Sequence, residues 1–264
     1  MKAKILIFTI SLLLLAGFCF VHAQEEDVEV AAVSESAEGL DLQAVSDLFQ
    51  EAENLEDFER ALNDPDLGIN NLDLDENGEV DFIRVIEEVS GETHVIVLQV
   101  PLGEEDYQDV ATIEVEKDED GNVNMQAHGN DDFYGPDYYV APTVVVNTWP
   151  IITWMYRASY KPYRSIYRFG YYPRWWKPWR PVAFAAYHAR VIKRPRRQVF
   201  VVRNTSRVRT VHRVKYKPRR STRVVKRTTV TRKPGGKKVI RTTTVKKKPG
   251  KKAVVKKTTV RKKR

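Results

Sequence analysis

Apolar residues recur at three- and four-residue steps between residues 41 and 63, which predicts one amphipathic helix there. Acidic residues occupy the opposite face, and Asp64-Pro65 is typical of a helix end. The predicted apolar face consists of Leu42, Val45, Leu48, Phe49, Ala52, Leu55, Phe58 and Leu62.

From residue 80 the apolar pattern changes to a period of two, which predicts short strands. Turn residues such as Ser90-Gly91 and Asp120-Gly121-Asn122 separate the runs. We expect strands within residues 80–85, 94–100, 110–116 and 123–127. Together with the helix they predict an acidic α+β domain over residues 41–140, in which one N-terminal helix packs on a small antiparallel β-meander of three to five strands.

The first 23 residues have the pattern of a secretory signal peptide. Lys2 and Lys4 precede an apolar run, and Val21-His22-Ala23 places small or tolerated residues before a cleavage point. An uncleaved membrane anchor is the alternative. Residues 24–40 are predicted to be an acidic linker. We therefore expect a periplasmic, envelope-bound or secreted protein that contains no cysteine after cleavage, because Cys19 lies in the signal peptide.

The second half of the chain has a different composition. Residues 141–190 are rich in aromatic residues, prolines and basic residues, and they include all five tryptophans. Residues 191–264 form a low-complexity basic tail in which a Val- and Thr-rich unit recurs every 15 residues, beginning at Val224, Val239 and Val254. These units are too short and too charged to bury a core, so we expect the tail to be disordered.

Charge is segregated along the chain. All 35 acidic residues lie at or before Asp137, whereas 39 of the 44 basic residues lie after it, for a net charge of +9. One large enzyme domain over the whole length is thereby excluded, because the second half lacks carboxylates that could act as acid, base or metal ligand. The histidines stand in no metal-ligand spacing, and no nucleophile motif occurs. We expect a protein that is not an enzyme.

The run from Asp73 to Asp81 has the D-x-D-x-N-G-x-V-D pattern of calcium loops, in which oxygen ligands surround the ion and a glycine allows a sharp turn. It resembles the loops of EF-hands and dockerins through nine positions. Arg84 stands where an EF-hand places its bidentate glutamate, so any affinity for Ca²⁺ should be weak. The alternative is an acidic turn without an ion. The candidate calcium ligands are Asp73, Asp75, Asn77, Glu79 and Asp81.

Residues 55–140 also resemble a family of uncharacterised secreted Gram-negative proteins. The resemblance depends on this acidic loop, on Phe82-Ile83-Arg84-Val85 and on the stretch from Tyr107 to Glu114. The family has no established activity, so the resemblance implies no catalytic residue.

A cluster of tryptophans and basic residues is similar in composition to Trp- and Pro-rich cationic antimicrobial peptides. Such side chains suit a membrane surface or lipopolysaccharide phosphates. They also suit single-stranded nucleic acid. The alternative is that the rings pack within the protein. The candidate contact residues are Arg174, Trp175, Trp176, Lys177, Trp179 and Arg180.

The tail itself resembles histone-like basic tails, and counterion release lets such a segment bind any polyanion. Together with the signal peptide, this predicts a protein that binds lipopolysaccharide, acidic polysaccharide or extracellular DNA. A tail that only adds solubility is the alternative. The candidate contacts are Lys226, Arg227, Lys237, Lys238, Lys246, Lys247, Lys248, Lys251, Lys252, Lys256 and Lys257.

Two further hypotheses follow from the same features. A calcium-dependent interaction module, with the acidic domain as its working part, is the alternative function. The opposite charges of the two halves also predict that at low salt the tail folds back over its own domain or associates with that of a neighbour.

Overall fold

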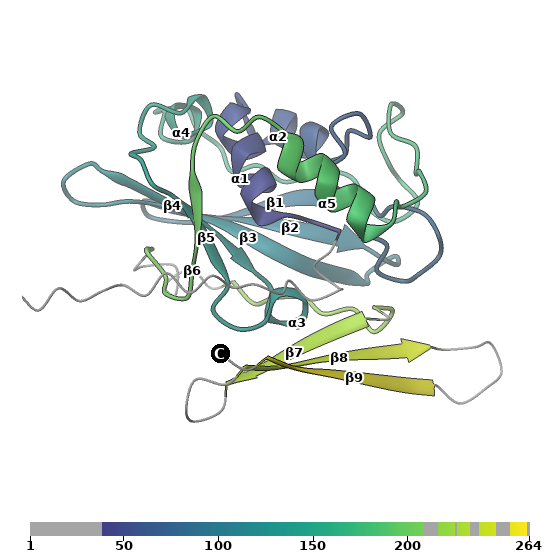
Figure 1. Ribbon diagram of the computed structural model, residues 1–264. Helices are drawn as coiled ribbons and strands as arrows, with labels where there is room; N and C mark the ends of the chain where they lie inside the picture. The colour runs from purple at the N-terminus through teal and green to yellow at the C-terminus, as the bar shows by residue number, and fades with distance from the viewer. Residues whose placement is uncertain (1–38, 209–215, 225, 233–237, 247–253, 263–264) are drawn as a thin grey trace, which may run out of the picture.

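The computed structural model of the protein describes residues 39–208, 216–224, 226–232, 238–246 and 254–262 (Figure 1). The predicted signal peptide over residues 1–23 lies outside these residues, as does most of the predicted acidic linker. Leu40, at the end of that linker, is fully buried, and its carbonyl accepts a hydrogen bond from the Tyr134 hydroxyl at 2.7 Å. The folded part therefore begins at or before residue 40.

Two helices replace the single helix expected over residues 41–63. Helix α1 spans Leu42–Glu51 and helix α2 spans Leu55–Leu62. The chain leaves helical geometry at Ala52, and the Asn54 side chain then accepts the N–H of Asp57 at 2.9 Å to cap α2. All eight residues of the predicted apolar face are nevertheless buried.

The central element is a six-stranded antiparallel sheet in which the strands are paired in sequence order, which confirms an α+β fold. Each strand pairs with the next along the chain, so the sheet is one meander. Its strands are β1 (Arg84–Ser90), β2 (Thr93–Pro101), β3 (Tyr107–Lys117), β4 (Val123–Gly129), β5 (Tyr139–Pro142) and β6 (Phe200–Arg203).

The helices cover one face of this sheet (Figure 1). Besides α1 and α2, this layer contains α4 (Pro150–Met155) and α5 (Phe184–Lys193). The main core lies between the layers and combines, for example, Phe49 and Phe58 of the helices with Ile96 and Leu98 of β2. Helix α3 (Asp131–Tyr134) follows β4 at the end of the sheet, and its Phe133 and Tyr134 belong to the main core. Residues 216–224 and a second sheet lie on the other side of the sheet (Figure 1).

The segment boundaries expected at residues 140 and 190 do not mark breaks in the structure. Strand β5 runs across the first boundary and helix α5 across the second. Strand β6, which belongs to the expected basic tail, pairs with β5 and completes the sheet. Three consecutive apolar residues that favour strands, Phe200-Val201-Val202, help this part of the basic half (residues 141–264) to fold with the acidic half (residues 24–140).

A second sheet stands in place of the disorder expected for the rest of the tail. Its strands are β7 (Lys226–Arg232), β8 (Lys238–Lys246) and β9 (Val254–Lys262), in that order and antiparallel. The register pairs most basic residues with Thr or Val; Arg241, for example, stands between Thr229 and Thr259. Arg232, Lys238 and Lys262 are the exception, because they are paired with one another across the three strands. The hairpin turns expected at Pro234-Gly235 and Pro249-Gly250 lie outside the described residues.

Candidate functional site

The sheet face opposite the helices carries a polar, acidic surface. Glu114 of β3 lies at its centre: its carboxylate accepts hydrogen bonds from Thr112 Oγ1 at 3.1 Å and from Gln126 Nε2, and it lies 3.2 Å from His128 Nδ1. Asp109, also of β3, is 1% exposed and accepts a hydrogen bond from Gln99 Nε2. Thr112 and Glu114 alternate onto the face away from the apolar core, and a β-bulge at Val110, where the register with β2 shifts between Leu98 and Gln99, brings Asp109 onto the same face. We call this surface, with Asp106 and Asp132 at its edges, the acidic face.

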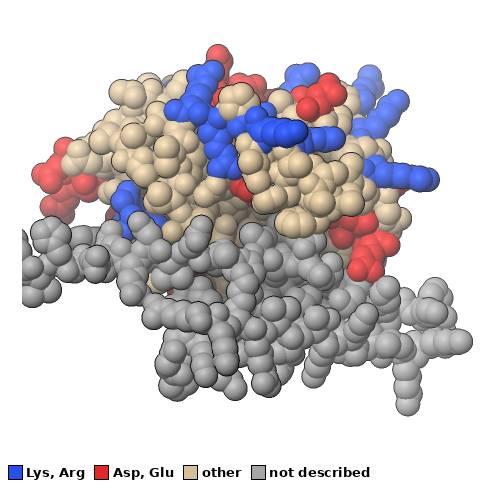
Figure 2. Space-filling view, in the orientation of Figure 1, with Lys and Arg blue, Asp and Glu red and all other residues tan. Residues whose placement is uncertain are grey.

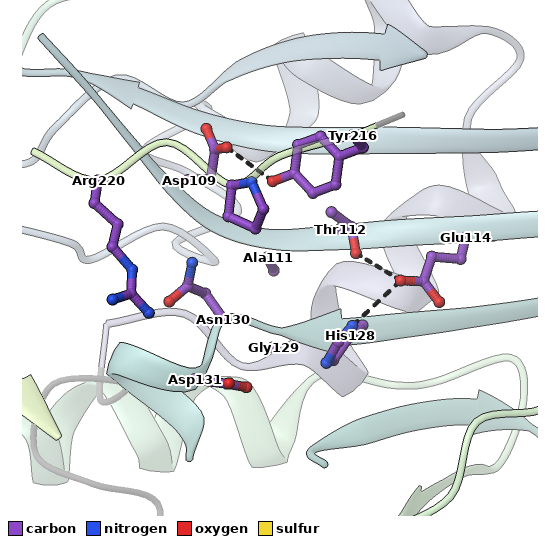
Figure 3. Close-up of a pocket in the computed structure, with 11 residues that line it drawn as sticks. Asp109, Ala111, Thr112, Glu114, His128, Gly129, Asn130, Asp131, Tyr216 and Arg220 are labelled. Atoms are coloured by element: carbon purple, nitrogen blue, oxygen red, sulfur yellow. Dashed lines mark hydrogen bonds and ion pairs between the residues drawn. The ribbon is translucent and has the colours of Figure 1, made fainter. Parts of the chain in front are cut away.

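A segment of the basic half lies across the acidic face. Residues 216–224 follow an extended path there, and the Tyr216 hydroxyl donates to Asp109 Oδ2 at 2.8 Å (Figure 3). The Arg219 N–H donates to the same oxygen at 2.7 Å, and the Arg219 carbonyl accepts the Asp109 N–H at 3.1 Å. Farther along, the Ser221 N–H donates to Gln108 Oε1 at 3.0 Å. Backbone and side chain of one acidic strand therefore hold the segment in a fixed register.

Side-chain charges reinforce this register. Arg220 pairs with Asp132 at 3.2 Å and Arg223 with Asp106 at 3.5 Å. The Arg219 guanidinium lies 5.2 Å from the centre of the Tyr107 ring, a distance typical of cation–π contacts. These arginines remain mostly exposed, so the pairs are partly screened by solvent.

Tyr216 anchors the segment through both ends of its side chain. The ring packs against Ile86, Val95 and Val97, which form a small apolar cluster on this face. Burial, followed by the negative charge of Asp109, raises the pKa of the Tyr216 hydroxyl well above its ordinary value. The hydroxyl therefore stays protonated and remains a donor to Asp109.

Two cavities flank the segment. One, of about 310 Å³, lies between it and strands β3 and β4; Figure 3 shows the Glu114–His128 pair on one side of it and Arg220 on the other. Its remaining lining residues include Asn130, Asp131 and Pro218. The other cavity, of about 560 Å³, is lined among others by Arg84, Glu88, Tyr107, Arg164 and Lys217. The segment is thus held at separate points and does not fill the surface beneath it.

The predicted calcium loop folds as a hydrogen-bonded turn. Asp73 accepts the N–H groups of Asn77 and Gly78, both at 3.0 Å, and Asn77 Oδ1 accepts the N–H of Glu79 at 2.8 Å. Gly78 has a φ of 89°, the left-handed conformation that the sequence predicts there. Within the described part of the chain, no three His, Cys, Asp or Glu side chains are grouped closely enough to hold a metal ion. Calcium binding stays a prediction.

Asp81, the last predicted ligand, is turned into the loop. Its Oδ2 accepts the Leu74 N–H at 2.7 Å. The pKa of the Asp81 carboxyl is raised to about 8. Burial is the largest cause, and the negative charges of Asp75 and Asp73 contribute to the rise. Asp81 therefore retains its proton at neutral pH, and ionising it would add a third negative charge beside Asp73 and Asp75.

The tryptophan cluster divides into buried and exposed members. Trp176 is 8% exposed and its ring packs edge-on against Phe82, with centroids 5.3 Å apart. The Trp179 carbonyl accepts the Val80 N–H at 2.7 Å and joins this segment to the predicted calcium loop. Trp175, in contrast, is 43% exposed and has Arg60 over its ring. Packing within the protein accounts for Trp176, and Trp175 remains available at the surface.

Arg174, Lys177 and Arg180 are exposed, and none of them forms an ion pair with a carboxylate of the described residues. Other arginines of the basic half are neutralised within the protein. Figure 2 shows Lys and Arg side chains spread over the upper part of the described surface. Among the described residues, arginines with carboxylate partners include Arg164, Arg194, Arg196, Arg197, Arg220 and Arg223.

The candidate tail contacts fall partly on the second sheet. Lys226 and Arg227 are in β7, Lys238 and Lys246 in β8, and Lys256 and Lys257 in β9. The others, Lys237, Lys247, Lys248, Lys251 and Lys252, lie outside the described residues.

The sequence did not indicate Asp109, Glu114 or Gln126 as part of a site. For Glu114 and Gln126 the signal was the alternation of polar with apolar residues inside predicted strands, which marks a face outside the apolar core. Asp109 precedes the strand predicted at residues 110–116 and had no such signal. Tyr216 and the arginines after it were not predicted as site residues, because they lie in the tail that was expected to be disordered.

Comparison with protein-family models, with curated proteins and with solved structures finds no match. The resemblance to secreted Gram-negative proteins therefore stays a prediction. No helix within the described ranges has the length and apolar character needed to cross a membrane.

Proposed function

We propose that this protein binds polyanions of the cell envelope, such as lipopolysaccharide, acidic polysaccharide or extracellular DNA, through its basic half. The proposal places it in the periplasm, at the envelope or outside the cell, and gives it no catalytic role. What supports it most directly is the group Arg174, Lys177 and Arg180, exposed around Trp175 and without carboxylate partners among the described residues.

Unpaired cations at a protein surface keep their counterions until an anionic partner replaces them. Release of those ions drives association with any dense polyanion. An exposed tryptophan between the cations adds a flat apolar surface that suits a nucleic-acid base or a lipid headgroup region. The geometry therefore favours contact with a charged polymer or surface over recognition of one small ligand.

The 18 basic residues of 225–264 add a second and larger source of positive charge. The acidic residues are all elsewhere in the sequence, so this region has no anionic neighbours along the chain. Deletion of 225–264 tests the contribution of the repeats while it retains β6 and residues 216–224, which are parts of the folded sheet structure.

The experiment is a salt series with heparin and with double-stranded DNA of unrelated sequences. Affinity should fall by orders of magnitude between 50 and 200 mM salt, with little preference for DNA sequence. Affinity that does not change with salt, or binding to one DNA sequence alone, contradicts the proposal.

A matched pair of variants locates the contact. Arg174→Gln with Arg180→Gln removes two unpaired cations and should lower the slope of log K against log salt by about 2. Arg164→Gln with Arg197→Gln removes the same charge from arginines already paired with Glu88 and Glu51, and should change the slope less. Equal slopes for both variants would place binding outside the tryptophan cluster.

Calcium-dependent interaction through the acidic domain is the second candidate. Burial raises the pKa of the Asp81 carboxyl to about 8, and the neighbouring charges of Asp75 and Asp73 add to the rise. A divalent cation would offset the negative charge gathered at this turn, which favours this candidate. Arg84, at the twelfth position, opposes it. If the acidic domain is the working part, partner binding should require millimolar Ca²⁺ and survive deletion of 225–264.

A further inference from the structure

The acidic face and residues 216–224 together have the features of a receptor and its ligand. The face offers Asp109 and Gln108 as acceptors, and Asp106 and Asp132 as charges at its edges. The segment offers extended backbone N–H groups, a tyrosine hydroxyl and arginines at matching positions. Extended peptides are commonly held in this way, through backbone hydrogen bonds supplemented by side-chain contacts.

We propose that the acidic face is a docking site for the basic segment Tyr216–Arg223 of the same chain, and that a bound polyanion displaces this segment. The face then acts as a built-in competitor that lowers affinity for weakly charged partners. This inference rests on the proposed polyanion binding and extends it to regulation.

The contacts of the segment are of the kind that a polyanion can replace. Arg220 and Arg223 contribute exposed ion pairs, with side chains 60% and 56% exposed, and such pairs are weakened by salt and by competing anions. The cavities of about 310 and 560 Å³ on either side limit continuous packing against the sheet. A segment with few buried apolar contacts opens more readily than the core.

Two apolar contacts oppose release of the segment from the acidic face and contribute most to the free energy that release requires. The Tyr216 ring covers the cluster of Ile86, Val95 and Val97, and Val224 is buried with the main core. The segment is thus fastened at both ends by apolar side chains, with the polar and charged contacts between them. A dense polyanion that engages Arg219, Arg220 and Arg223 together should release the middle first.

Hydrogen exchange of the full chain, resolved to single amides, tests this directly. The N–H groups of Arg219 and Ser221 donate to Asp109 and Gln108 and should exchange slowly in the free protein. Saturating heparin should speed their exchange at least tenfold while amides of β2 stay protected. Unchanged protection with heparin bound overturns the docking proposal and leaves polyanion binding intact. Absence of heparin binding overturns both.

A matched pair of variants supplies the second measurement. Asp106→Asn with Asp132→Asn weakens the face and should raise heparin affinity about fivefold at 50 mM salt, because two exposed ion pairs are lost. Glu53→Gln with Glu56→Gln changes the net charge equally at exposed sites on and beside α2. An equal gain in both variants means that net charge alone sets affinity, and contradicts the proposal.

Protein concentration distinguishes docking within one chain from exchange between chains. Protection at Arg219 and Ser221 should be the same at micromolar and at hundredfold higher concentration. Protection that rises with concentration would show that the segment docks on a second copy, and would overturn docking within the chain.

Discussion

Asp109 and Arg219 are joined by two hydrogen bonds, although they belong to the acidic and basic halves of the chain. The Arg219 N–H donates to Asp109 Oδ2 at 2.7 Å, and the Asp109 N–H donates to the Arg219 carbonyl at 3.1 Å. The contact depends on the backbone of Arg219 and not on its charge. The backbone pairing of Arg219 with Asp109 therefore fixes the register of the basic segment on β3.

Asp109→Ala should lower the free energy of unfolding by about 2–4 kcal/mol, because it leaves the Gln99 amide, the Tyr216 hydroxyl and the Arg219 N–H without their acceptor. Urea denaturation measures the change. Glu104→Ala, at an exposed position between β2 and β3, is the control and should change stability by less than about 0.5 kcal/mol. A similar small change for both variants would mean that Asp109 does not hold the segment.

Trp175 and Trp176 should respond oppositely to replacement. Trp176→Ala removes a buried ring from the contact with Phe82 and should cost about 3–5 kcal/mol of stability. Trp175→Ala should cost less than about 1 kcal/mol, the scale of its contact with Arg60, but should weaken binding to heparin or anionic vesicles. Urea denaturation and the salt series separate these effects. Loss of stability in Trp175→Ala without loss of binding would remove it from the contact surface.

The helical face and the antiparallel sheet could be predicted because their apolar periodicities follow local rules. The helix break could not be predicted with the same rules, since Ala52 and Leu55 continue the apolar spacing while the chain turns between them. Asn54, followed three residues later by Asp57, was the local sign of a new helix start.

The role of the basic half could not be predicted from composition, because composition does not specify pairing. Phe200–Arg203 pairs with the edge of β5, about 60 positions earlier in the chain, and composition does not identify that partner. Tyr216 finds an apolar cluster formed by residues of β1 and β2, more than a hundred positions earlier. Charge segregation predicts attraction between the halves, but it does not specify a register such as the one between Asp109 and Arg219.

Calcium should raise the melting temperature if the predicted loop binds it, because a ligand stabilises only the form that holds it. Asp73→Ala with Asp75→Ala removes two ligands and should abolish any rise seen at millimolar Ca²⁺. Thermal unfolding in Ca²⁺ and in chelator provides the measurement, and Asp118→Ala with Asp120→Ala, in another acidic turn, is the control. Equal melting temperatures of the unaltered protein in both conditions would identify the loop as a turn alone.

Glu59 should make the protein less stable as pH rises through the neutral range. It is 2% exposed, its Oε2 accepts the Val85 N–H at 2.6 Å, and burial raises the pKa of its carboxyl from 4.5 to about 7. Hydrogen bonds from Val85, Ser165 and Tyr163 and the charge of Arg84 oppose the rise without cancelling it.

Because the folded protein holds this proton more tightly than the unfolded chain, the contribution of Glu59 is complete below pH 4.5 and is lost as pH rises to about 7. The loss amounts to up to about 3 kcal/mol. Glu59→Gln keeps an oxygen that can accept the Val85 N–H but cannot ionise. The difference in unfolding free energy between this variant and the unaltered protein should therefore grow in favour of the variant from pH 5 to pH 8, as measured by urea denaturation. A difference that stays constant over this range would show that Glu59 does not exchange its proton on unfolding.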